Sequence, residues 1–78
     1  MELHETVKAI RLEMGLSQRK LSEELRVSFA AVNRWENGHT KPNLIARHAL
    51  IELAKQYDIN NELINAFEDS EWLIKVLK

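Results

Sequence analysis

The chain has 78 residues, no cysteine and a formal net charge of −1. A domain of this size buries only a small core, so a large enzyme cleft is not expected. The absence of cysteine excludes disulfides and thiolate metal sites and fits a reducing compartment. The charged N-terminal residues do not resemble a signal peptide, and no apolar run reaches the about 20 residues of a membrane-spanning helix. We therefore expect a soluble cytoplasmic protein.

Charge is distributed unevenly along the chain. Residues 18–48 carry six basic and three acidic side chains, whereas residues 49–78 carry three basic and six acidic ones. A net charge near zero argues against binding nucleic acid through bulk charge alone. The uneven distribution still allows the positive segment to face phosphates while the negative segment repels them.

Apolar spacing predicts three helices in the first half of the chain. Residues 3–14 repeat apolar side chains at helical spacing, and Gly15 ends this helix. Ser17 is a suitable N-cap for a second helix that ends near Arg26. Ser28 caps a third helix that Asn37 and Gly38 end, with the inward residues Ala31, Val32 and Trp35.

The helical pattern continues in the second half. Asn43 caps a fourth helix, and Asn60 or Asn61 opens a fifth. The inward residues of the fourth helix are Ala46, Leu50, Leu53, Ala54 and Tyr57, and the fifth contains Leu63, Ile64 and Phe67. The sequence therefore predicts an all-α fold, a compact domain of five short helices with a short C-terminal helix or strand extension.

The extension, residues 62–78, carries more apolar surface than one small domain readily buries. One helical face holds Leu63, Phe67, Ile74 and Leu77, and a second holds Trp72, Leu73 and Val76. The alternation within EWLIKVL also fits a strand. We therefore treat residues 62–78 as a candidate dimerisation segment that follows a domain spanning residues 1–61. The alternative is that the segment packs on its own domain.

Residues 18–37 predict two short helices joined by a turn of about three residues, the helix-turn-helix arrangement. The apolar residues of this segment are Leu21, Leu25, Val27, Val32 and Trp35. They can share one core only if the two helices cross steeply, which leaves the first turns of the second helix projecting. A projecting helix fits the major groove of DNA, which is about 12 Å wide.

The chain resembles the XRE family of phage-repressor and Cro-type DNA-binding domains over about residues 4–60. The matching residues are Arg11, Gly15, Leu16, Ser17, Gln18, Leu21, Leu25, Val27, Ser28, Val32, Glu36, Asn37, Gly38 and Pro42. The resemblance implies a helix-turn-helix over about residues 17–37 that binds double-stranded DNA as a homodimer on an inverted repeat, as a transcription regulator and repressor. Arg26 stands where the family usually has glycine in the turn, so either the turn differs or Arg26 adopts left-handed geometry.

The resemblance also implies that the recognition helix, about residues 28–37, presents its first residues to base edges. The candidate base contacts are Ser28, Phe29, Ala30, Asn33 and Arg34. Arg34 can donate twice to guanine and Asn33 can pair with adenine, while Phe29 and Ala30 can contact thymine methyl groups. The alternatives are that Arg34 is a solvated surface charge and that Phe29 belongs to the core.

A second set of residues is expected to hold the DNA backbone. By the resemblance, the candidate phosphate contacts are Gln18, Asn37, His39 and Lys41. Arg19, Lys20 and Arg47 are further candidates on the same patch. Capping is the alternative for Asn37, and ordinary solvation is the alternative for His39 and Lys41. The resemblance further implies a partly buried pair between Arg11 and Glu36, and the spacing places Trp35 in the core.

Two other classes of function, an interaction protein and an enzyme, are alternatives to DNA binding. The same fold can serve in an antitoxin or adaptor protein that uses the apolar segment 62–78 to bind a protein partner. An enzyme is not expected, because the three histidines form no i, i+4 metal pair and the chain has neither a thiol nucleophile nor a glycine-rich phosphate loop. No metal and no cofactor is expected.

Overall fold

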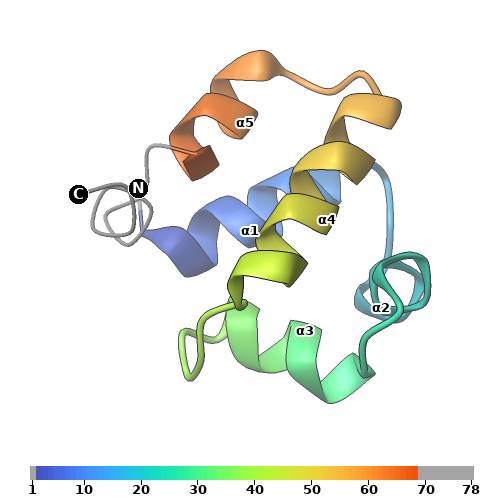
Figure 1. Cartoon of the computed structure of the whole chain (residues 1–78), viewed down its shortest axis with the longest axis vertical. Helices are drawn as coiled ribbons and strands as arrows, with labels where there is room; N and C mark the ends of the chain where they lie inside the picture. Colours follow the sequence, from blue (N-terminus) through green and yellow to red (C-terminus); the bar gives the residue numbers. More distant parts are fainter. Residues whose placement is uncertain (1, 69–78) are drawn as a thin grey trace.

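The computed structural model describes residues 2–68, which contain five α-helices and no strand. The helices are α1 (Leu3–Glu13), α2 (Gln18–Leu25), α3 (Phe29–Glu36), α4 (Leu44–Gln56) and α5 (Asn61–Glu68). The predicted all-α fold is confirmed. Figure 1 shows α3 at one end of the molecule and α5 at the other, with α1 and α4 between them. The choice between a helix and a strand for EWLIKVL lies outside the described residues.

Three predicted caps begin the helices that position the site. The Ser17 hydroxyl accepts a hydrogen bond from the Lys20 amide at 3.0 Å, and the Ser28 hydroxyl accepts one from the Ala31 amide at 3.0 Å. At the start of α4, the Asn43 side-chain oxygen accepts a hydrogen bond from the Ala46 amide at 2.8 Å. Each cap satisfies a backbone donor that would otherwise have no partner in its helix.

The turn between α2 and α3 uses a left-handed residue. Arg26, the C-cap of α2, has φ 59° and ψ 43°, so the position keeps the geometry that glycine favours although its side chain is arginine. The Val27 amide donates to the Ser22 carbonyl oxygen at 3.0 Å across this turn. Of the two possibilities raised by the sequence, the structure therefore shows the second, in which Arg26 adopts left-handed geometry.

One hydrophobic core joins all five helices. Its buried residues are Val7, Ile10, Met14, Leu21, Val32, Trp35, Ala46, Leu50, Ala54, Ile59, Ile64 and Phe67. Trp35 is buried as predicted. Phe67 of α5 is 1% exposed and packs in this shared core. Tyr57 departs from the prediction that it faces inward, because it follows the end of α4 and is 38% exposed. Its hydroxyl instead donates to the Glu24 carboxylate of α2 at 2.9 Å.

Candidate nucleic-acid interface

Helix α3 divides into a buried face and an exposed face. Val32, Trp35 and Glu36 are buried against the rest of the domain. Ala30 and Arg34 are exposed on α3, next to the exposed N-cap Ser28. Figure 1 shows α3 at one end of the molecule.

Phe29 opens α3 and lies on the surface. Phe29 is 41% exposed, which excludes the alternative that it belongs to the core. The Arg19 guanidinium of α2 lies 5.1 Å from the centre of the Phe29 ring, within cation–π range. This contact joins the starts of α2 and α3 and keeps a cation beside the exposed ring.

Asn33 is the one candidate base contact that the structure does not leave exposed. It is half-buried, and its amide nitrogen donates to the Gln18 side-chain oxygen at 3.2 Å. Its amide oxygen accepts a hydrogen bond from the Asn37 side chain at 3.1 Å. Asn33 therefore links two of the candidate phosphate contacts.

The candidate phosphate contacts lie near the C-terminal half of α3, where Gln18 bonds to Asn33 and Glu36. Gln18, at the start of α2, is half-buried, while Asn37, His39 and Lys41 are exposed after α3. Among the further candidates, Arg19 and Lys20 are exposed at the start of α2. Exposed cations and amides thus lie at the start of α2 and after α3, and such groups can bind phosphates.

Arg47 does not belong to this surface, contrary to the interpretation of the sequence. It is 3% exposed, and its Nε donates to the Pro42 carbonyl oxygen at 2.8 Å. Burial lowers the pKa of Arg47 to about 10 because desolvation disfavours the charged form. The arginine therefore fastens the loop before α4 and is not available to DNA.

The predicted pair between Arg11 and Glu36 is present and buried. Arg11 Nε donates to Glu36 Oε2 at 2.6 Å, and Arg11 Nη2 donates to Glu36 Oε1 at 2.9 Å. The Gln18 side chain also donates to Glu36 Oε1, at 3.0 Å. A bidentate arginine–carboxylate pair fixes orientation as well as distance, so α1 holds the end of α3 in place.

Sequence reasoning missed the amide contacts among Gln18, Asn33 and Asn37. The spacing of Asn33 and Asn37, four residues apart on one helix face, was a usable signal. The contact between Gln18 and Asn33 depends on how α2 and α3 cross, and no local pattern reveals it.

Comparison with known proteins agrees with this geometry. The sequence profile of the helix-turn-helix family matches residues 7–60, which is more than half of the chain. This chain belongs to the helix-turn-helix family. A helix-turn-helix domain supports a function in DNA-binding transcription regulation rather than in catalysis.

One curated relative shares part of this helix-turn-helix domain. The HTH-type transcriptional activator BcrR of Enterococcus faecalis is 39% identical over 44 residues, which are 56% of this chain and 22% of that protein. The chain thus spans about a fifth of the length of the relative that it matches. No solved structure gives a significant match.

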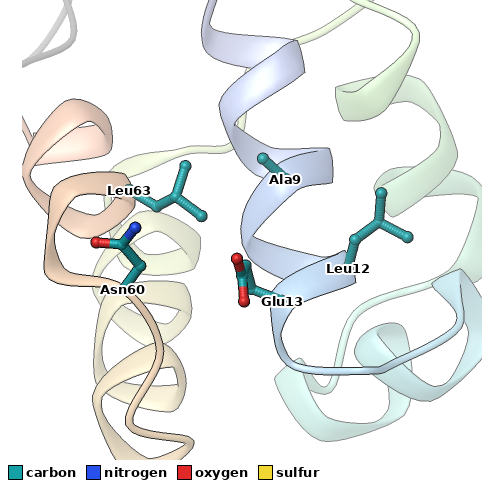
Figure 2. A pocket seen from close by; sticks show the side chains of 5 residues that line it. All are labelled: Ala9, Leu12, Glu13, Asn60 and Leu63. Carbon is teal, nitrogen blue, oxygen red and sulfur yellow. The ribbon is translucent and has the colours of Figure 1, made fainter.

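The helix-turn-helix domain also has an open groove between α1 and α5 (Figure 2). It measures about 560 Å³, and the lining residues are Ala9, Leu12, Glu13, Asn60 and Leu63. None of the candidate DNA contacts lines it. Within residues 2–68 there is no cluster of three metal-ligating side chains, and no helix there is long and apolar enough to cross a membrane.

Proposed function

We propose that this protein is a sequence-specific transcription regulator that reads the major groove of double-stranded DNA with α3. The observation that carries the proposal is the division of α3, whose Trp35 side is buried while Phe29, Ala30 and Arg34 are exposed. Arg34 reads guanine through two N–H donors, and Phe29 and Ala30 contact thymine methyl groups. Ser28 adds a hydroxyl donor, because the cap uses its oxygen only as an acceptor.

The backbone contacts in this proposal come from Gln18, Asn37, His39 and Lys41. They fix the register of α3 in the groove and carry no sequence information. The exposed cations Arg19 and Lys20 add to the positive potential at the same end of the molecule.

The proposal further assigns a homodimer and an inverted-repeat operator. A helix as short as α3, which has eight residues, spans only a few base pairs, so one copy selects a site poorly. Two copies related by a two-fold axis read two half-sites about 34 Å apart. Repression is the proposed effect, because occupying a promoter blocks polymerase without any further contact, whereas activation needs one. The antitoxin or adaptor alternative depends on the apolar segment 62–78, of which residues 69–78 lie outside the described residues.

Selection from a randomised duplex library tests the proposal directly. The native chain is expected to enrich an inverted repeat that contains a fixed guanine, and Arg34→Ala is expected to relax the preference at that guanine alone. Lys55→Ala is the matched control, because Lys55 lies in the last turn of α4, at the end that Figure 1 places away from α3. Salt-dependent binding without any enriched sequence would contradict groove reading and leave only phosphate contact.

A further inference from the structure

Three side-chain amides form a continuous hydrogen-bonded chain from the core to the surface. Glu36 Oε1 accepts from Gln18 Nε2 at 3.0 Å, and Gln18 Oε1 accepts from Asn33 Nδ2 at 3.2 Å. Asn33 Oδ1 then accepts from Asn37 Nδ2 at 3.1 Å. The chain starts at a buried carboxylate and ends at an exposed amide, and it crosses from α3 to α2 and back.

The buried carboxylate fixes the direction of every amide in this chain. Both oxygens of the Glu36 carboxylate accept hydrogen bonds from Arg11, and a carboxylate in such an ion pair only accepts hydrogen bonds. Gln18 must therefore turn its NH₂ group toward Glu36 and its oxygen toward Asn33. Asn33 must in turn present its NH₂ group to Gln18 and its oxygen to Asn37. The reversed order would place an amide oxygen against the carboxylate.

This order leaves hydrogen-bond donors unused. Each amide nitrogen carries two hydrogens, and each donates one of them to the next side chain in this series of hydrogen bonds. The second N–H of each amide is left for another acceptor. Phosphate oxygens only accept hydrogen bonds, so a set of oriented N–H donors suits the DNA backbone and disfavours partners that donate.

We propose that Asn33 is a positioning residue, which transmits the orientation set by Glu36 and holds Gln18 and Asn37 with N–H groups toward DNA phosphates. The inference rests on the proposed function, because it takes DNA as the ligand. The sequence predicts that Asn33 contacts a base, and the inference assigns it a positioning role instead. Bidentate reading of adenine needs the amide nitrogen and oxygen on one open edge, whereas the bonds of these two atoms to Gln18 and Asn37 set the orientation of the Asn33 amide.

A mutant cycle in DNA affinity tests the positioning role. Asn33→Leu, which keeps the size of the side chain, is expected to weaken binding to a mixed-sequence duplex by about fivefold at low salt. In a Gln18→Met/Asn37→Ala background the same substitution is expected to have no effect, because nothing remains to be positioned. Lys41→Ala is the matched control. The changes in binding free energy caused by Lys41→Ala and Asn33→Leu should be additive. Asn33→Ala serves as a second variant, and circular dichroism confirms that each variant folds.

Nuclear magnetic resonance of the free protein tests, without DNA, whether the three amide side chains are joined by hydrogen bonds. Asn37→Ala is expected to shift the side-chain NH₂ resonances of Gln18, because the side chains of these two residues are joined by hydrogen bonds through Asn33. Lys41→Ala should leave them in place. Unmoved Gln18 resonances in Asn37→Ala would overturn the inference.

The DNA measurements separate failure of this inference from failure of the proposed function. An equal effect of Asn33→Leu in both backgrounds, or a loss confined to duplexes with adenine at one position, overturns the positioning role while groove reading stands. Binding that shows no preferred sequence contradicts groove reading, while the cycle on mixed-sequence DNA still decides the role of Asn33. Absence of binding to any duplex overturns both.

Discussion

Arg11 and Glu36 form a two-point contact that joins the first helix to the end of the third. The two side chains are 10% and 2% exposed, and their hydrogen bonds are 2.6 Å and 2.9 Å long. Arg11 also donates to the Leu16 carbonyl oxygen at 2.9 Å, so one guanidinium organises the connection between α1 and α2 as well. The pair thus sets the position of the proposed recognition helix against the rest of the domain.

Breaking this pair is expected to destabilise the domain more than replacing it. Glu36→Leu leaves the Arg11 charge buried without its partner, so we expect the free energy of unfolding to fall by about 3–5 kcal/mol. The double variant Arg11→Met/Glu36→Leu exchanges the pair for apolar contact and is expected to recover most of that loss. Urea unfolding followed by circular dichroism measures both. Equal stability of the single and double variants would show that the cost does not come from an unpaired charge.

Relief of the left-handed turn is expected to stabilise the protein. Arg26 has φ 59°, a conformation that costs a non-glycine residue about 1–2 kcal/mol. Arg26→Gly removes that cost but gains freedom in the unfolded chain, so the expected net gain is about 0.5–1 kcal/mol. Arg26→Ala is the matched control, because it removes the same side chain and keeps the strain. The prediction fails if the two variants unfold at the same urea concentration.

Much of this fold was predictable because its signals are local. Ser17, Ser28 and Asn43 cap helices through hydrogen bonds to residues three positions away, and helical spacing located the core. Left-handed geometry at Arg26 was one of two predicted possibilities, because the family resemblance places glycine at this position.

The sequence was less informative where a side chain had two plausible environments. Arg47 was predicted on the surface but folds back onto Pro42, and Tyr57 was predicted in the core but reaches Glu24 on another helix. Both choices depend on where a distant segment packs. The same holds for Asn33, whose contact with Gln18 spans two helices.

The contact between Tyr57 and Glu24 predicts a loss of stability at alkaline pH. The hydrogen bond to the carboxylate, aided by desolvation and by the charge of Glu24, raises the pKa of Tyr57 in the folded chain. The bond therefore contributes fully below the unfolded pKa of about 10, and its contribution is lost as the pH rises through the folded value. Because the chain has one tyrosine, absorbance of tyrosinate reports this pKa alone.

Two variants check the origin of the Tyr57 effect. Glu24→Gln is expected to lower the folded pKa of Tyr57 toward its ordinary value. Tyr57→Phe is expected to remove this part of the stability loss in urea unfolding between about pH 9 and pH 11. A native titration that matches the one in Glu24→Gln would rule out the carboxylate as the cause.

The salt dependence of DNA binding separates phosphate contacts from base contacts. Lys41 is exposed in the loop after α3, and Lys41→Ala is expected to weaken binding to all duplexes alike. The slope of log K against log salt should decrease in magnitude by about 1, because one fewer counterion is released. Fluorescence anisotropy across a salt series measures this slope, with Lys55→Ala as the control. An unchanged slope would mean that Lys41 binds no phosphate.

Phe29 provides a test of base contact that leaves the fold intact. The residue is 41% exposed, so Phe29→Ala is expected to lower the free energy of unfolding by no more than about 1 kcal/mol, chiefly through the lost contact with Arg19. If the ring meets a thymine methyl group, replacing that thymine by uracil should weaken native binding by about 0.8 kcal/mol, or fourfold. The replacement should not affect Phe29→Ala. Arg19→Ala is the matched control, because it removes the cation beside the ring and keeps the methyl contact, so it should remain sensitive to uracil. Equal sensitivity of the native chain and Phe29→Ala would place the ring away from the methyl group and assign thymine preference to another residue of α3.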